Sequence, residues 1–348
     1  FIKEKKINKN IIFFHDNKSI KNTTINYKNI FSYKLIFKKN FILRNLKLIN
    51  YIKAFKNSLI LIFKLGFSKS LILKELIYCE YAQLNKDCLP DYALFNMSNM
   101  TLQPLWSTIK NKNNDQIDFL YYYSTNIVPL VENPDLAPNV FGYRIQSWNN
   151  YIFWNNNHRK WVEKCAKRNI NSTVINNYIP FEGKNISIIK SKNKRIIIFD
   201  IPPRNDFVYY NFMHVGNIYS YEYCSKFFED VVSTIKKSFK QVEIFYKIKR
   251  DISSINSEYK NKFLNAQTKI DGFKIFYDEV SAQSLIKACD ASISIPFTST
   301  VLIADYLKKP SVYYNPSQVS LRSNFSENDN NLINNKPDLE TWLNKVCI

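Results

Sequence analysis

Residues 194–348 alternate between short apolar runs and longer stretches with helical spacing. Residues 195–200 hold four consecutive apolar residues without polar alternation, which predicts a strand buried on both faces. The alternation then predicts helices over 221–239, 257–266, 282–289, 300–307 and 339–346, the last capped by Asp338, and strands over 241–246, 273–276, 291–295 and 311–314. This order predicts a parallel sheet with helices on both faces.

Residues 61–185 predict a second α/β unit. Helices are expected over 69–85 and 148–168, the latter around three tryptophans, and strands over 92–95, 117–123 and 173–179. Residues 183–193 have the composition of a linker. We therefore divide the chain into a basic segment (1–60), an N-terminal domain (61–185) and a C-terminal domain (194–348).

The N-terminal segment carries most of the charge. Residues 1–60 hold 14 Lys/Arg and two acids, whereas the rest of the chain holds 35 cations and 27 acids. Residues 31–55 mix bulky apolar residues with lysines, which predicts a basic amphipathic helix. Such a helix suits an anionic lipid surface, but an ordinary helix with a solvated lysine face has the same pattern.

Composition excludes several functions. With only 5 glycines in 348 residues, the chain contains neither a dinucleotide-binding glycine motif nor a P-loop. The net charge of +20 suggests nucleic acid, yet we find no nucleic-acid motif and expect no such partner. The six cysteines form no C-x-x-C pair, so we expect no metal site and read them as reduced thiols of a cytoplasmic protein. The longest apolar run is too short to span a bilayer.

Ligands of open parallel sheets bind beyond the carboxyl ends of the strands, and the sharpest such end is Pro296-Phe-Thr-Ser-Thr300. Thr298, Ser299 and Thr300 follow a buried strand and open a helix, where free N–H groups and hydroxyls favour a phosphate. A plain Ser/Thr helix cap is the alternative.

Three further strand ends carry polar residues. Lys247, Lys249 and Arg250 suit a diphosphate or a sugar carboxylate, although a solvated basic loop is the alternative. Arg204 follows Asp200 in a candidate binding loop, and His214 is either a site residue or a packed histidine. Asp278 and Glu279 are expected either to cap the next helix or to contact ribose hydroxyls.

Residues 289–316, with Pro296-Phe297-Thr298-Ser299 and Lys309-Pro-Ser-Val-Tyr-Tyr-Asn-Pro316, resemble the bacterial polysaccharide-biosynthesis proteins named for a Pro-Phe-Thr-Ser motif. Those proteins are associated with O-antigen and other surface carbohydrate assembly. The resemblance extends over 194–316 and weakens over 90–180. It implies a GT-B-like α/β fold, with two Rossmann-like domains whose parallel sheets face a cleft.

The resemblance also implies roles for single residues. Ser299 and Thr300 match the hydroxyl pair that related transferases place on the donor phosphate. Lys247 matches the lysine of a Lys-Pro-His-Pro turn, but Lys249 and Arg250 replace the His and the second Pro. The ribose-binding Glu of many relatives falls on Ile303 and is therefore missing.

The implied reaction is glycosyl transfer from a nucleotide sugar to a glycan or lipid-linked acceptor, without a metal or other cofactor. An inverting enzyme needs a base, and Glu132 is the preferred candidate, with His214 the second. Such a protein would be cytoplasmic or peripheral on the inner face of the inner membrane. The alternatives are a non-catalytic basic module that binds membrane or nucleic acid, an inactive GT-B paralogue, and a nucleotide-sugar epimerase or hydrolase.

Overall fold

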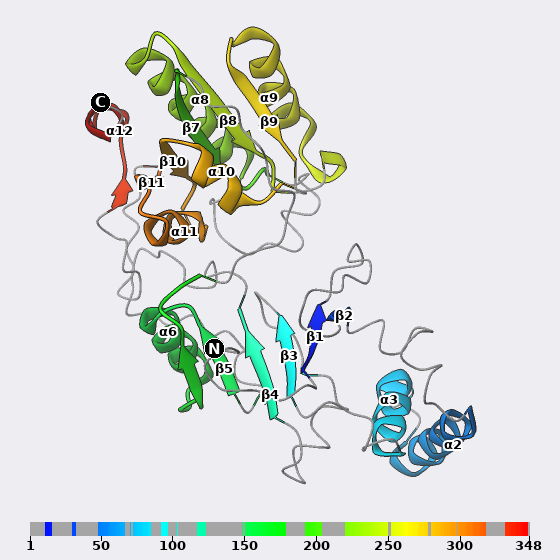
Figure 1. Ribbon diagram of the computed structural model, residues 1–348. Helices are drawn as coiled ribbons and strands as arrows, with labels where there is room; N and C mark the ends of the chain where they lie inside the picture. The colour runs from blue at the N-terminus through cyan, green and yellow to red at the C-terminus, as the bar shows by residue number, and fades with distance from the viewer. Residues whose placement is uncertain are drawn as a thin grey trace. The chain divides into compact units, whose positions relative to one another are not determined.

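The computed structural model divides the chain into two compact units, each built on a six-stranded parallel sheet (Figure 1). Unit 1 comprises 1–122 and 137–176, and unit 2 comprises 123–136 and 177–348. The structure describes residues 11–15, 30–32, 48–66, 70, 72–84, 92–96, 103, 117–122, 148, 150–178, 192–203, 220–249, 252–277, 280–296, 298–317 and 331–346. Residues 1–60, which the sequence analysis set apart, fall within unit 1. The α/β class with two parallel sheets is confirmed.

The sheet of unit 1 has the strand order β2-β1-β3-β4-β5-β6, all parallel. Its strands are β1 (Ile11–His15), β2 (Ile30–Ser32), β3 (Tyr92–Asn96), β4 (Ile117–Tyr121), β5 (Asn150–Phe153) and β6 (Ser172–Val174). The helices described in this unit are α2 (Leu48–Leu65), α3 (Leu73–Leu84) and α6 (Asn156–Ala166). The order reverses between β1 and β3, as in flavodoxin-like sheets.

Two helix predictions in unit 1 are wrong in position. The stretch predicted as one helix over 148–168 contains β5 and then α6, because Asn155 breaks it: the Asn155 side chain accepts from the N–H of His158 and caps α6. Of the helix predicted over 31–55, residues 31–32 lie in β2, residues 48–55 lie in α2, which continues to 65, and residues 33–47 lie outside the described residues. Trp148 and Trp154 are 2% and 0% exposed, so they pack in the core.

The sheet of unit 2 has the order β12-β11-β10-β7-β8-β9, all parallel. Its strands are β7 (Lys194–Phe199), β8 (Val242–Lys247), β9 (Phe273–Phe276), β10 (Ala291–Ser294), β11 (Ser311–Tyr314) and β12 (Leu332–Ile333). Its helices are α8 (Tyr221–Ser238), α9 (Ser257–Lys269), α10 (Ala282–Ala288), α11 (Thr300–Tyr306) and α12 (Lys336–Val346), with a short 3₁₀ helix at Ile252–Ser254. Read from β9, this is the 3-2-1-4-5-6 order of a Rossmann sheet.

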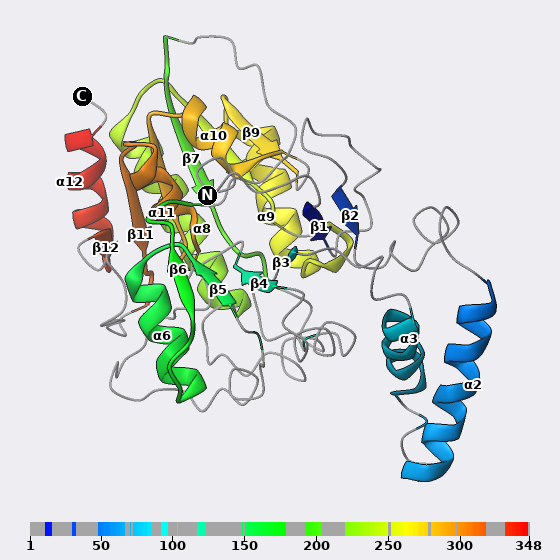
Figure 2. The same cartoon turned by 60° about the horizontal axis from the view of Figure 1, so that its bottom comes forward.

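The central strands β10 and β11 and the apolar part of β7 are buried on both faces, as the apolar run in 195–200 predicts for β7. One face, with Ile196 and Ile244, packs in a single cluster with α8, α9 and α12. Helices α10 and α11 contact β7, β10 and β11 and cover the other face (Figures 1 and 2). The turn into β9 requires glycine, because Gly272 has a φ of 78° and a Cβ there would lie 2.7 Å from the Val242 carbonyl oxygen.

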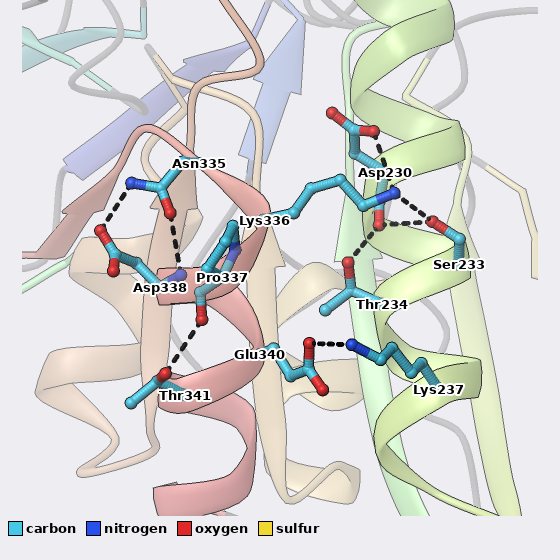
Figure 3. A network of polar contacts seen from close by, with 10 residues as sticks. All are labelled: Asp230, Ser233, Thr234, Lys237, Asn335, Lys336, Pro337, Asp338, Glu340 and Thr341. Carbon is cyan, nitrogen blue, oxygen red and sulfur yellow. Dashed lines mark hydrogen bonds and ion pairs between the residues drawn. The ribbon is translucent and has the colours of Figure 1, made fainter.

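Helix α12 docks along α8 through an apolar contact bordered by ion pairs (Figure 3). Lys336 lies 3.4 Å from Asp230 and donates to Ser233, and Lys237 pairs with Glu340 at 2.7 Å. The prediction that Asp338 caps this helix is wrong. The helix begins two residues earlier, and the Asn335 side chain accepts from the N–H of Asp338.

The four cysteines in the described ranges, Cys79, Cys165, Cys224 and Cys289, are free thiols, as predicted. Desolvation raises the pKa of the Cys289 thiol to about 12 and that of Cys165 to about 11. These thiols are therefore protonated and unreactive at neutral pH.

Candidate functional site

The switch point of the unit 2 sheet lies between β7 and β10, where the strand order reverses. Ligands of such sheets bind at the carboxyl edge of this point, because the loops after the two strands diverge there. The backbone N–H of Ile295 donates to the Phe199 carbonyl at 2.8 Å, so the two strand ends stay paired up to the edge. Asp200 follows β7 and Pro296-Phe-Thr-Ser299 follows β10, which places the motif at this edge.

A chain of three hydroxyls joins β10 to α11. Thr298 donates to the Ile295 carbonyl at 3.0 Å, Thr300 lies 3.0 Å from the Thr298 hydroxyl, and Ser294 lies 2.7 Å from the Thr300 hydroxyl. Each hydroxyl has one proton to donate, so the order that uses each proton once runs Ser294 to Thr300 to Thr298 to Ile295. The two threonine protons are thus engaged within the protein.

Ser299 has a different position from its two neighbours. It is the N-cap residue of α11, and its side chain makes no capping hydrogen bond. It is half-buried, whereas Thr298 is 6% exposed. The two threonines therefore shape the loop, and contact of Ser299 with a ligand stays a prediction.

A second contact holds the motif from β11. The Tyr313 hydroxyl donates to the backbone carbonyl of Thr298. Beyond the end of β11, the fully buried Asn315 accepts from the Tyr223 hydroxyl at 2.9 Å and donates to the Asn334 side chain at 2.9 Å. The Lys309–Pro316 segment, which carried part of the sequence resemblance, therefore braces the carboxyl edge.

Asp200 forms a buried polar centre on the other side of the switch point. It is 2% exposed, and its Oδ2 accepts from the hydroxyls of Tyr246 on β8 and Tyr259 on α9. Desolvation, and then the Asp200 charge, raise the pKa of both phenols well above the usual value. The N–H of Asn256, the α9 cap, donates to the Pro203 carbonyl at 3.0 Å, which fixes the start of the loop after β7.

Lys247, the last residue of β8, holds two loops together. Lys247 is 7% exposed, and its ammonium donates to the carbonyls of Ile248 at 2.9 Å and Tyr277 at 2.7 Å. These bonds fix the β8 and β9 carboxyl ends to each other. Lys249 is exposed two residues later, so its charge is in contact with solvent at the same edge. Binding of the donor by these lysines stays a prediction.

Six of the predicted site residues lie outside the described residues: Glu132, Arg204, His214, Arg250, Asp278 and Glu279. Asp118 and Glu80 are two of the acids that the structure describes in unit 1. Asp118 is fully buried near the start of β4 and accepts from Gln103, and Glu80 on α3 accepts from Asn57. Neither acid lies at the carboxyl end of a strand. Within the described ranges, no group of His, Cys, Asp or Glu side chains could hold a metal ion.

Unit 1 contains a buried histidine that the sequence analysis did not single out. His158, in the first turn of α6, is 1% exposed, and its ring lies 4.8 Å from that of Tyr122 and 5.0 Å from that of Phe153. Neither of its ring nitrogens has a hydrogen-bond partner in the structure. Desolvation lowers its pKa from 6.5 to about 3, so the ring is neutral at pH 7.

The sequence analysis also missed Ser294, Tyr246, Tyr259 and Asn315. Ser294 carried a usable signal, because it is a hydroxyl at the carboxyl end of a short strand, two residues before the Pro296–Ser299 motif. The tyrosines had none, since a Tyr in a buried strand or helix has the pattern of core packing.

The model of one protein family matches residues 52–343 of this sequence, and its description is polysaccharide biosynthesis PFTS motif protein. The chain belongs to this family. The matched range includes the whole unit 2 sheet and the Pro296–Ser299 motif that names the family. The family predicted from the sequence is confirmed. No curated protein matches the sequence.

Several solved structures are similar to the chain. One is an α,α-trehalose 6-phosphate synthase from Burkholderia multivorans, with 9% identity, 97% of this chain and 83% of that chain covered, and a TM-score of 0.46. Another is Anabaena HepE in complex with UDP and glucose, with 11% identity, 77% and 71% covered, and a TM-score of 0.42. A third is the lipopolysaccharide outer core galactosyltransferase WaaB, with 11% identity, 80% and 72% covered, and a TM-score of 0.41.

Proposed function

We propose that this PFTS motif protein is a glycosyltransferase, which moves a sugar from a nucleotide-activated donor to a growing surface polysaccharide or a lipid-linked acceptor. One observation carries the proposal. In a protein of a polysaccharide-biosynthesis family, the family's own motif follows the strand at the switch point of a Rossmann sheet. That edge is where such sheets bind nucleotides.

The donor phosphate is assigned to the start of α11. Ser299 faces the ligand, while the Thr300–Thr298 hydroxyl chain and Tyr313 hold the loop in shape. Helix α11 has only seven residues, so hydrogen-bond donors near its start contribute more to phosphate binding than its dipole does. Lys249, together with Arg250 and Arg204, supplies positive charge for the phosphates. Asp278 and Glu279 are assigned to the ribose hydroxyls.

The reaction breaks the bond between the anomeric carbon and the phosphate oxygen, and the nucleotide leaves with the bonding electrons. The acceptor hydroxyl oxygen forms the new bond to that carbon and loses its proton to a base. Glu132 is the proposed base and His214 the second candidate. The cations near the phosphates stabilise the leaving nucleotide in the role that a metal ion has in other transferases.

The acceptor and its place in the cell belong to the same proposal. A lipid-linked or surface glycan grows at a membrane, so the protein is proposed to work in the cytoplasm, peripheral on the inner face of the inner membrane. The strongly basic N-terminal region, with 14 cations and two acids in 1–60, supports an anionic surface as a partner.

A thermal-shift panel of CMP, CDP, UDP, GDP and dTDP on the full chain tests donor binding. One nucleotide is expected to raise the melting temperature of the wild type, and Ser299→Ala is expected to weaken that response about tenfold or more. Thr268→Val, which removes an exposed hydroxyl on α9, is the matched control and should respond as the wild type does. No response to any nucleotide would contradict a transferase and favour an inactive paralogue.

A further inference from the structure

Helix α2 presents a large apolar surface to solvent. Six of its side chains are between 43% and 78% exposed: Ile49, Tyr51, Ile52, Phe55, Ile60 and Phe63. Phe63, at 78%, is more exposed than any other large apolar side chain that the structure describes. Isolated exposed apolar residues are common, but a contiguous set on one helix marks an interaction surface.

The other side of α2 is occupied by α3, and the two helices lie side by side in Figures 1 and 2. Ala54, Ser58 and Ile62, spaced four residues apart, are buried on this side. The Tyr51 and Tyr81 rings meet edge to face at 6.1 Å. Among the described elements, neither helix has a comparably close contact with the sheet of unit 1. Pairing with α3 therefore leaves the outer face of α2 uncovered.

Five of the six exposed residues form one continuous arc, and Tyr51 lies on the side of α3. At about 100° per residue, Phe55, Ile52, Phe63, Ile49 and Ile60 follow one another within about 140° around the axis. Lys53 and Lys64 lie next to Ile60 along one border of this arc, and Lys56 lies within it. All three lysines are exposed, and their long stems can carry the ammonium groups past the apolar side chains.

The positive charge of this region indicates which kind of partner binds the outer face of α2. Helix α2 contains three lysines and no acid, and residues 31–47 before it add five cations and again no acid. A second copy of the apolar arc would bring lysines against lysines. The apolar interior of a protein partner would bury these lysines away from water. An anionic surface of lipid headgroups pairs with the lysines while its acyl region takes the apolar side chains.

We propose that the outer face of α2, with the apolar arc and Lys53, Lys56 and Lys64, docks the protein on an anionic lipid surface. This deepens the membrane association proposed above by naming the residues that make it. The helix lies in the plane of the interface and does not cross the bilayer. None of the helices described in the structure has the length and apolar character that a crossing requires. Docking would hold the protein where lipid-linked acceptors are.

Vesicle flotation with the full chain tests this proposal. The wild type is expected to float with phosphatidylcholine vesicles that contain phosphatidylglycerol, and much less with phosphatidylcholine alone or at high salt. Ile52→Ser with Phe63→Ser removes the centre of the arc, and Lys53→Gln with Lys64→Gln removes its charged border. The lysine pair is expected to weaken binding about tenfold or more, because every lysine near an anionic surface adds roughly a fivefold factor. The apolar pair is also expected to weaken binding about tenfold or more, because two large side chains no longer enter the acyl region.

Matched controls change the same chemistry elsewhere. Tyr277→Ser removes an exposed aromatic side chain from unit 2, and Lys269→Gln with Lys345→Gln removes two cations from α9 and α12. These variants should float as the wild type does. Equal flotation of the α2 variants and the wild type would overturn the proposal, as would failure of the wild type to bind anionic vesicles.

Two further readouts distinguish lipid docking from self-association and from nucleotide binding. If sedimentation velocity shows a dimer that Phe63→Ser dissociates, the face belongs to a second copy and the proposal is wrong. The nucleotide thermal shift is measured on the same α2 variants and should be unchanged. If the wild type binds no nucleotide but still floats with anionic vesicles, the transferase proposal is wrong and the docking proposal is still supported.

Discussion

The hydroxyl oxygen of Ser294, the last residue of β10, lies 2.7 Å from that of Thr300, the first residue of α11. Ser294 is fully buried, so it depends on this contact for its hydrogen bond. The contact fixes the loop that carries Pro296–Ser299 by joining its two ends.

Thr300→Val is therefore expected to lower the free energy of unfolding by about 1–3 kcal/mol, because it leaves buried hydroxyls without their partner. Thr300→Ser keeps the hydroxyl and should cost much less. Urea denaturation of both variants, followed by circular dichroism, compares them. If Ser destabilises the protein as much as Val or more, the hydroxyl contact does not have the weight assigned to it here.

The Asp200 centre gives a second prediction. Tyr246→Phe and Tyr259→Phe each remove one donor to the carboxylate and should each cost about 1–3 kcal/mol of stability. Asp200→Ala should cost more than either, since it leaves two buried phenols without their acceptor. Tyr277→Phe, at an exposed position, is the control and should stay within about 0.5 kcal/mol of the wild type. The urea concentration at the midpoint of unfolding, compared between variants with equal m-values, measures the stability of all four.

Five of the six strands of unit 2 could be predicted from the sequence, because each is a short, largely apolar or buried stretch between predicted helices, whereas the two-residue β12 was missed. The predicted 195–200 and the observed Lys194–Phe199 differ by one residue at each end. Unit 1 was harder to predict. Strand β5 is followed by helix α6 with no Gly or Pro between them, and the break depends on the side chain of Asn155, which composition alone does not reveal.

The candidate site was predictable in outline only. A motif after a buried strand indicates the carboxyl edge of the sheet, but it does not show which of its hydroxyls hold the loop. That Thr298 and Thr300 are bonded within the protein depends on the positions of Ser294 and Ile295. The same holds for Lys247, whose ammonium binds two carbonyls that no spacing rule identifies.

His158 predicts that acid destabilises the protein. Its pKa is about 3 when folded and near 6.5 when unfolded, so the unfolded state binds the extra proton between these values. Stability is therefore complete above pH 6.5 and falls as the pH drops, by roughly 2 kcal/mol between pH 7 and pH 5. His158→Phe should remove this component, which urea denaturation at both pH values measures. An unchanged pH dependence in the variant would assign the effect to other groups.

The docking of α12 should depend on its leucines rather than its ion pairs. Leu339 and Leu343 are fully buried, whereas the Lys237 side chain is 71% exposed. Leu339→Ala is expected to cost about 2–5 kcal/mol, and Lys237→Ala about 0.5 kcal/mol or less. Hydrogen exchange of peptides over 336–346 reports on this helix. Faster exchange in the lysine variant than in the leucine variant would reverse this ranking.

Acceptor-dependent sugar transfer tests the central claim most directly. The full chain is incubated with labelled sugar nucleotides of the UDP, GDP, dTDP and CMP classes, with and without a lipid-linked glycan fraction. The account predicts that label from one class enters the acceptor, and that Ser299→Ala lowers this rate while Thr268→Val does not. Absence of transfer from every class by a chain that is folded, or label released equally without acceptor, would contradict it.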